Sequence, residues 1–350
     1  MDRRQRLETA MRRGVPDRVP VWCQLSTGHV QAHGLPNGRA PRNGEEIVEA
    51  TCNLTRRYRF DGLFLGSVGL RPDKTPEGRD RDSMGLRWYE AGQRYEGDLG
   101  AIDPDRWPQE PWTWTADDFY GCRVARDIVG DDTHIGGWTP DAFSRAVNWF
   151  AVRGMSEAML AMVADPERFE AIVNWFRPRV IQYTLDQIRY GGVRSIHISC
   201  PYAGSSFISK ADYRRFVLPS IEDLARVLRP LGVFSYVHNC GFIGDRLELI
   251  AESGVDGIEC MDPPPLGDVE LADAKRRVGS RIFLRGNLDS VNVLWRADEE
   301  TFVQNVRATI EAGKPGGGYI LGTACSVAPD VPPKRMRHLF ELLEEYGYYK

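Results

Sequence analysis

Residues 232–261 read GVFSYVHNCGFIGDRLELIAESGVDGIECM and contain two short apolar runs separated by a helical pattern. The run at 232–240 is β-branched and aromatic, as expected of a buried strand, and the run at 254–261 has the same short length. Between them, apolar residues over 243–253 follow the spacing of an amphipathic helix. Two strands connected through a helix are the basic unit of a parallel α/β sheet.

The same strand–helix unit recurs through the second half of the chain. In the first half, the runs DRVPVWCQLS, FDGLFLGS and THIGGW supply three more apolar segments. Eight strands that alternate with helices favour a closed parallel (β/α)8 TIM barrel. The remaining strands of the second half are predicted at 194–200, 281–289 and 317–325, and its other helices at 211–228, 269–277, 298–312 and 333–346.

The chain is interpreted as a single barrel domain over residues 1–350. Residues of about 70–125 carry many charges, glycines and tryptophans and are predicted to form an insertion over the barrel mouth. Paired helices across 141–190 are a second elaboration. Trp107, Trp112 and Trp114 either line a wide pocket or pack the insertion onto the barrel. A two-domain doubly wound sheet is the weaker alternative, because no linker and no glycine-rich phosphate loop follows the first strand.

Composition and charge exclude several classes of protein. The 350 residues are 42% hydrophobic and 27% charged with a net charge of −4, so the chain lacks the basic footprint of a nucleic-acid-binding protein. The N-terminus MDRRQRLETAMRRG lacks the apolar core of a signal peptide, and no apolar run reaches the roughly 18 residues of a membrane span. We therefore expect a cytoplasmic protein without nucleic-acid or membrane partners. Its seven cysteines, an odd number without framework spacing, argue against a disulfide scaffold.

Residues that bind metals or transfer protons gather where the predicted strands end. Active sites of (β/α)8 barrels lie at this rim, and a purely structural barrel has no need of such a set there. The candidates at or near strand ends are His134, Cys200, His238, Cys240, Glu259, Asp262, Asn287, Asp289 and Cys325.

His238 and Cys240 form the first candidate metal pair. Side chains two positions apart on a strand face the same side, with about 6.5 Å between their Cα atoms. Cys325 follows the last strand, 85 residues after Cys240, and barrel closure brings remote strand ends over one opening. Three such ligands with an open position describe a catalytic zinc site. The structural alternative is a buried polar residue and two thiols that pack as small hydrophobic groups.

Four further residues have a functional and a structural interpretation each. Glu259 is either a fourth zinc ligand, exchanged when a thiol arrives, or a carboxylate that supports the ligands from behind. Asn287 and Asp289 either orient substrate or hydrogen-bond the zinc-bound imidazole, or they brace their loop. His134 is either a general acid/base or a satisfied strand histidine.

Four other side chains are assigned from their positions. Trp138 closes the same apolar run as His134 and is a candidate substrate contact. Asp262, in the turn MDPPP, is expected to cap backbone groups. Cys260 should point away from Glu259 because side chains alternate along a strand. Cys200 lacks a matching motif.

Several motifs resemble the uroporphyrinogen decarboxylase superfamily. They are VHNCG (237–241), LRGNLD (284–289), GGYILGTACSVAPDVPPKRM (317–336), ETAMRRGVPDRVPVW (8–22) and DSMGLRWYE (82–90). Together they span nearly the whole chain. The resemblance implies a (β/α)8 barrel with its pocket at the strand C-termini, and a homodimer, since members are often dimeric.

The superfamily holds two chemistries. The decarboxylases act on porphyrinogens without a metal and use an arginine loop at the first strand, whereas the corresponding stretch here, VPVWCQLSTGHV, has no arginine. The other branch resembles this chain more: the methylcobamide:thiol methyltransferases and their relatives in corrinoid-linked demethylation. Its zinc signature, H-x-C followed much later by C, matches His238, Cys240 and Cys325.

This branch implies a zinc-dependent methyltransferase. Zn²⁺ would help a thiol to lose its proton, and the thiolate would attack a methyl group on the cobalt of a methylcorrinoid. The implied partners are a corrinoid protein or free corrinoid, with a small thiol or a pterin as acceptor. The alternatives are a metal-free decarboxylase of the uroporphyrinogen type and a non-catalytic corrinoid-binding module.

Overall fold

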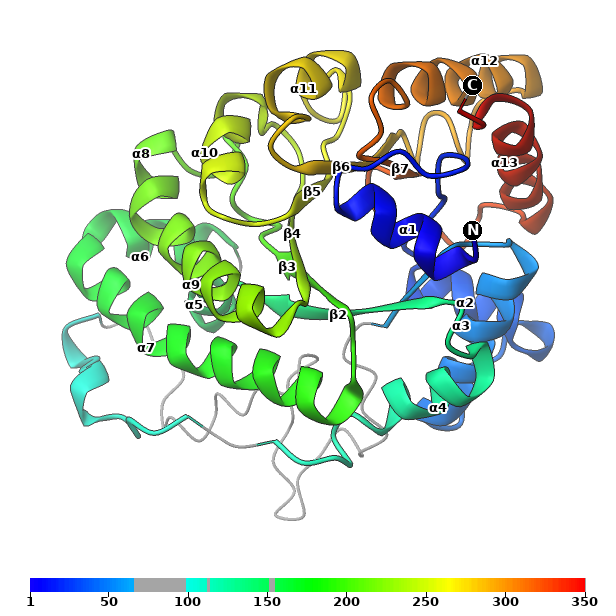
Figure 1. The fold of residues 1–350 in the computed structure, drawn as a ribbon. Coiled ribbons are helices and arrows are strands. Elements are labelled where there is room, and N and C mark those ends of the chain that lie inside the picture. Colours follow the sequence, from blue (N-terminus) through cyan, green and yellow to red (C-terminus); the bar gives the residue numbers. More distant parts are fainter. Residues whose placement is uncertain (66–98, 112–113, 151–154, 350) are drawn as a thin grey trace.

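The computed structural model describes residues 1–65, 99–111, 114–150 and 155–349. In this part of the chain, one curled parallel sheet is formed in which each strand pairs with the next strand in sequence (Figure 1). Consecutive parallel neighbours require a crossover outside the sheet, and the helices supply it. The strands are β1 (Gly62–Phe64), β2 (His134–Pro140), β3 (Ser195–Ser199), β4 (Phe234–Asn239), β5 (Gly257–Cys260), β6 (Phe283–Leu288) and β7 (Tyr319–Thr323).

The helices surround the strands, as Figure 1 shows. Those predicted in the second half of the chain are confirmed, with small shifts at their ends. The predicted helix 211–228 is helical throughout, although its turn Tyr213–Val217 is π-helical. The helices are α1 (Arg3–Met11), α2 (Thr27–Gly34), α3 (Gly44–Arg57), α4 (Tyr120–Val129), α5 (Ala142–Phe150), α6 (Met155–Ala164), α7 (Pro166–Asp186), α8 (Lys210–Asp212), α9 (Leu218–Leu228), α10 (Leu247–Glu252), α11 (Leu271–Val278), α12 (Glu299–Gly313) and α13 (Pro333–Tyr346).

The strand predicted at 17–26 is present as an extended segment with isolated bridges. On one side, Leu321 in β7 exchanges backbone hydrogen bonds with its neighbours in this segment, donating to the Pro20 carbonyl at 2.8 Å and accepting from Trp22 at 2.9 Å. On the other side, the Asp61 N–H, directly before β1, donates to the Val21 carbonyl at 2.8 Å. The segment therefore lies between the first and last strands of the sheet.

The interior of the curled sheet is filled from its amino end by α1. Leu7 and Met11 of this helix join a buried cluster with Trp22, Tyr236 and Phe283. Trp22 is fully buried and its ring occupies space that two strand glycines leave free. A Cβ atom at Gly136 would lie 2.6 Å from the Trp22 ring, so this strand position requires glycine for packing.

We expect Gly136→Ala to destabilise the fold by about 1–3 kcal/mol, the usual cost of inserting a methyl group into a filled core. The new methyl group would contact both the Trp22 ring and the Ser195 hydroxyl, 2.9 Å away. Urea unfolding monitored by far-UV circular dichroism measures the change. Gly28→Ala is the matched control, because the nearest atom to its Cβ is in Pro329 at 3.4 Å, an ordinary contact. Equal stability of the two variants would contradict this packing argument.

The predicted insertion is only partly within the described residues, and its motif DSMGLRWYE and Trp112 lie outside them. Two of its tryptophans pack against the rest of the fold, which is the second of the two interpretations given above. Trp107 contacts the rings of Trp149 and Trp175, with centroids 5.3 and 5.0 Å away, and Trp114 contacts the ring of Tyr183. No helix among the described residues is both long enough and apolar enough to cross a membrane.

Candidate metal centre

His238, Cys240 and Cys325 meet at the carboxyl ends of β4 and β7. One ligand atom from each lies within 4.8 Å of the other two, and His238 Nε2 is 3.1 Å from Cys240 Sγ. β4 and β7 are separated by two strands in the sheet, so its curvature brings their ends together. His238 is buried, while Cys240 and Cys325 are partly exposed. The three soft donor atoms therefore form one cluster that is accessible from the rim.

Glu259 lies behind the imidazole of His238. In the β4–β5 register the two residues are partners, and His238 Nδ1 is 2.8 Å from Glu259 Oε1. A carboxylate at this distance holds the proton on Nδ1, so that Nε2 faces the two sulfur atoms. The prediction of Glu259 as a fourth ligand is not supported by this position, because the imidazole ring stands between its carboxylate and the sulfurs.

The Glu259 carboxylate is itself held inside the curled sheet. Arg285 forms an ion pair with Glu259 Oε2, stacks on the Trp22 ring at 3.9 Å and donates to the Tyr236 hydroxyl at 3.1 Å. His197 Nδ1 is 3.2 Å from Oε1. Burial disfavours the charge of Glu259, but Arg285, His197 and His238 outweigh this effect and lower its pKa to about 2. The carboxylate that orients His238 is therefore ionised at neutral pH.

Cys325 is poised as a thiolate. Hydrogen bonds from Cys240 and Cys260, acting against burial and together with His238, hold the pKa of Cys325 far below its ordinary value. Burial favours neutral His238, yet the adjacent Cys240 sulfur raises the pKa of this imidazole well above its ordinary value. Thiolate and imidazole are the ligand forms that a borderline-soft divalent cation requires once the histidine proton is displaced.

Cys260 also reaches this cluster, which corrects the expectation that it points away. Cys260 and Met261 have φ angles of +75° and +54°, outside the extended range, so the alternation of side chains breaks at this strand end. The Cys260 thiol donates to Asp262 Oδ2 at 3.3 Å, and Asp262 also accepts from the Gly241 N–H at 2.6 Å. The predicted capping role of Asp262 is confirmed, with an additional thiol partner.

Asn287 and Asp289 brace their loops, as one of their two interpretations expects, and their contact with substrate stays a prediction. The Asn287 side-chain amide donates to the carbonyls of Met261 and Val269, at 2.9 and 3.0 Å. Asp289 accepts hydrogen bonds from the backbone N–H groups of Val291 and Asn292 at 2.8 Å, as a turn-forming aspartate does. Both side chains are thus engaged with the backbone of neighbouring loops.

His134 is at the wrong end of its strand for a rim residue. It begins β2, where its Nε2 is 2.8 Å from the Ser195 hydroxyl and its Nδ1 is 3.4 Å from Glu8. Burial lowers its pKa despite Glu8, so the ring is a satisfied neutral histidine. Trp138 lies further along β2, level with His197 and two positions below His238 in the register. Its contact with substrate remains a prediction.

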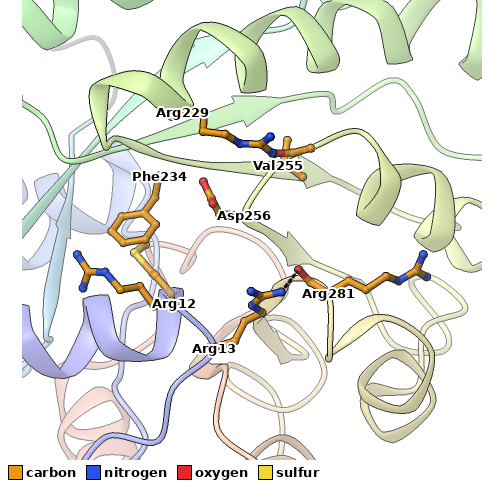
Figure 2. A pocket seen from close by; sticks show the side chains of 9 residues that line it. Arg12, Arg13, Arg229, Phe234, Val255, Asp256 and Arg281 are labelled. Carbon is orange, nitrogen blue, oxygen red and sulfur yellow. Dashed lines mark hydrogen bonds between the residues drawn. The ribbon is translucent and has the colours of Figure 1, made fainter.

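A cavity of about 320 Å³ lies at the opposite end of the sheet (Figure 2). Arg12, Arg13, Arg229 and Arg281 line it, beside Phe234 at the start of β4. Their guanidinium groups are engaged in the fold: Arg13 donates to the Arg281 carbonyl at 2.8 Å, and Arg229 donates to the Gly254 carbonyl at 2.8 Å. The length of β4 separates this cavity from His238, so it is not part of the cluster.

Sequence reasoning missed His197, Arg285 and Cys260. Arg285 could have been found, because the β5–β6 register pairs it with Glu259 and places both on the same face of the sheet. His197 lies two positions before Ser199, the register partner of His238, so alternation places it on the face of that histidine. The orientation of the Cys260 side chain could not be predicted from the sequence, because it depends on an irregular backbone.

Comparisons with known proteins agree with this architecture. A protein from Idiomarina loihiensis that is named uroporphyrinogen decarboxylase is 26% identical to this chain, over 95% of this chain and 92% of its own length. Another from Legionella pneumophila subsp. pneumophila is 24% identical, with 96% and 95% coverage. The structure is similar to that of a methyltransferase from Methanosarcina mazei, with a TM-score of 0.73, 17% identity and 99% coverage of both chains.

The similarity extends to a family profile that covers more than half of the sequence. The profile described as Uroporphyrinogen decarboxylase (URO-D) matches residues 121–346, which include β2 to β7 and therefore every residue of the thiol and imidazole cluster. Its span agrees with the motifs VHNCG, LRGNLD and GGYILGTAC that precede the loops of the site. The chain belongs to the uroporphyrinogen decarboxylase (URO-D) family.

Proposed function

We propose that this protein is a zinc-dependent methyltransferase of a corrinoid-linked methyl transfer or demethylation system, built on a closed (β/α)8 barrel. The observation that carries the proposal is the cluster of His238, Cys240 and Cys325, whose ligand atoms lie within 4.8 Å of one another. The segment between β7 and β1 supports closure, because it bonds to both.

The donor set fits zinc. Zinc binds imidazole nitrogen at about 2.0–2.1 Å and thiolate sulfur at about 2.3 Å, and catalytic sites have three protein ligands and one open position. His238 presents Nε2 with its tautomer held by Glu259, and Cys325 is poised as a thiolate. Carboxylate-rich sites suit magnesium or calcium, whereas nitrogen and sulfur donors select zinc.

The residues of the chain hold and orient the reactants. A bound zinc ion would lower the pKa of a coordinating thiol, so that a nucleophile forms at neutral pH. Cys240 and Cys325 are partly exposed, so a thiol or pterin acceptor and a methylcorrinoid, free or on a corrinoid protein, would approach from the rim. The thiolate sulfur or the pterin nitrogen of the acceptor would take the methyl group, and the electron pair of the methyl–cobalt bond would stay on the cobalt. The fold of the Methanosarcina mazei methyltransferase is consistent with this function.

Metal content tests the proposal. The purified protein should hold about one zinc per chain by elemental analysis, while His238→Ala and Cys325→Ser should each lose most of it, because two remaining ligands bind zinc weakly. His338→Ala is the matched control: this histidine lies on α13 and pairs with Glu299. Full zinc content in both site variants would refute the zinc site.

The curated relatives favour a second candidate, a metal-free decarboxylase, because those compared above are named uroporphyrinogen decarboxylases at 24–26% identity. The two candidates separate in one pair of assays. A methyltransferase should move the methyl group of methylcobalamin to a thiol or a folate from a panel, and metal removal should abolish this activity. Carbon dioxide release from a porphyrinogen that survives metal removal would favour the decarboxylase, and corrinoid binding without methyl exchange would indicate a binding module.

A further inference from the structure

The chain bulges around Cys325, where it leaves the regular pairing of β7. Two parallel bridges to the 17–26 segment bracket this bulge: Val21 with Leu321, and Leu25 with Val327. Between the bridges the 17–26 segment advances by four positions, whereas the chain that carries Cys325 advances by six. Extra residues of this kind re-aim a side chain and are frequent beside active sites. The orientation of Cys325 therefore depends on what holds the two ends of the bulge.

The far end of the bulge is held by Ser26. Val327 donates its N–H to the Gln24 carbonyl at 2.8 Å, and its own carbonyl accepts from the Ser26 N–H at 3.3 Å. The Ser26 hydroxyl donates to the same Val327 carbonyl at 2.7 Å. This hydroxyl also accepts the His29 N–H at 3.0 Å, as the N-cap of α2. One side chain thus closes the bulge and begins the helix.

His29 holds the next residue of the same loop. Its ring is fully buried, with Nδ1 2.9 Å from the Ala328 carbonyl and Nε2 2.9 Å from the Tyr58 hydroxyl. A carbonyl oxygen can only accept, so Nδ1 carries the proton and Nε2 accepts from Tyr58. Burial lowers the pKa of His29 to about 4, which agrees with a neutral ring. The loop is thereby tied to α2 and, through Tyr58, to the end of α3.

We propose that Ser26 and His29 are positioning residues of the metal centre, which hold the end of the bulge so that the Cys325 sulfur stays within reach of the other two ligands. This inference rests on the proposed function. His238 lies in β4 and Cys240 follows that strand directly, whereas Cys325 lies two residues beyond the end of β7. A ligand that must be ordered when the metal binds lowers the affinity, because its conformational freedom is lost at that step.

Competition with a chromophoric chelator measures the zinc affinity of Ser26→Ala and His29→Leu. Each should bind zinc about 10-fold more weakly than the wild-type protein, the lower end of the usual effect of changing a group that orients a ligand. Ser26→Thr keeps the hydroxyl and should restore the affinity. Ser209→Ala is the matched control, because Ser209 caps α8 by accepting the Asp212 N–H at 3.1 Å and its hydroxyl donates within that helix.

Hydrogen exchange of the metal-free protein examines the bulge without zinc. The Val327 amide is protected by its bond to the Gln24 carbonyl. We expect its exchange to become several-fold faster in Ser26→Ala and in His29→Leu, because the bulge opens locally more often. The amides of β5 should keep their wild-type exchange, which distinguishes a local opening from a general loss of stability. Ser209→Ala should leave the Val327 amide unchanged.

Each other outcome has a defined meaning. Wild-type zinc affinity in the folded Ser26→Ala and His29→Leu variants would overturn the inference and leave the zinc site intact. An equal loss in Ser209→Ala would also overturn it, because the loss of any helix cap would then suffice. Absence of zinc from the wild-type protein would overturn the proposed function, whereas hydrogen exchange would still decide whether Ser26 and His29 hold the bulge.

A further variant separates the two bonds of the Ser26 hydroxyl and serves if Ser26→Ala does not fold. Ser26→Asp still caps α2, because aspartate is a preferred N-cap residue. Its carboxylate cannot donate to the Val327 carbonyl, so zinc affinity should fall as it does in the alanine variant. Wild-type affinity in Ser26→Asp would overturn the role of this hydroxyl in holding the bulge.

Discussion

Replacing Asp61 by alanine should lower the free energy of unfolding by about 3 kcal/mol or more. The Asp61 carboxylate is fully buried and forms two ion pairs, with Arg6 Nη1 at 2.7 Å and with Arg18 Nη1 at 3.1 Å. It also accepts the Val21 N–H at 2.8 Å. Alanine would remove the shared partner of two guanidinium groups and leave a buried backbone donor unsatisfied, and both effects are costly. In the variant, Arg6 would still pair with Asp17 and Arg18 with Glu344. We therefore expect a loss of stability in the lower part of the usual range of about 3–5 kcal/mol for a broken buried ion pair.

Urea unfolding of the Asp61→Ala variant measures this loss. Glu311→Ala is the control, because its ion pair with Arg307 is about half exposed and exposed pairs contribute about 0–1 kcal/mol. A loss for Asp61→Ala no larger than that of the control would contradict the view that Asp61 joins α1, the 17–26 segment and β1.

Glu259→Gln should weaken zinc binding by about 10–100-fold, the usual effect of changing a carboxylate that orients a histidine ligand. Glutamine lacks the charge that holds the His238 proton on Nδ1, and it leaves Arg285 without its ion-pair partner. Competition with a chromophoric chelator measures the zinc affinity of the variant and its parent.

Glu252→Gln is the matched control for this prediction, since Glu252 forms an exposed pair with Arg281. Its zinc affinity should equal that of the parent. The unfolding free energy of the metal-free Glu259→Gln protein separates a general loss of stability from a specific loss of affinity. An unchanged zinc affinity in the folded variant would show that Glu259 does not orient His238.

The pattern of short apolar runs and amphipathic helices predicted the parallel sheet, because both signals are local in sequence. The runs at 232–240 and 254–261 became β4 and β5 with their predicted helix between them. The predicted first strand proved less regular, with isolated bridges at Val21 and Leu25. No local signal distinguishes a continuous strand from an extended segment that bonds alternately to two neighbours.

The assignments at the strand ends were less reliable, for a physical reason. Alternation of side chains holds only while the backbone stays extended, and it ceases at Cys260 with its positive φ. His134 was assigned to the rim although it begins β2, because the short run THIGGW did not show that the strand continues to Pro140. The side chains of Asn287 and Asp289 form hydrogen bonds with nearby loop backbone, whose position depends on the packing of several segments.

The identities and order of His238, Cys240 and Cys325, and the parallel sheet that carries them, could be read from residue types and periodicity alone. Their meeting depends on the curl of the sheet, which brings the ends of β4 and β7 within reach of each other. The same curvature sets Glu259 behind the imidazole of His238 and the Cys260 thiol beside that of Cys240. Contacts between residues far apart in the chain arise from packing of the whole fold, and a local sequence pattern by itself does not specify them.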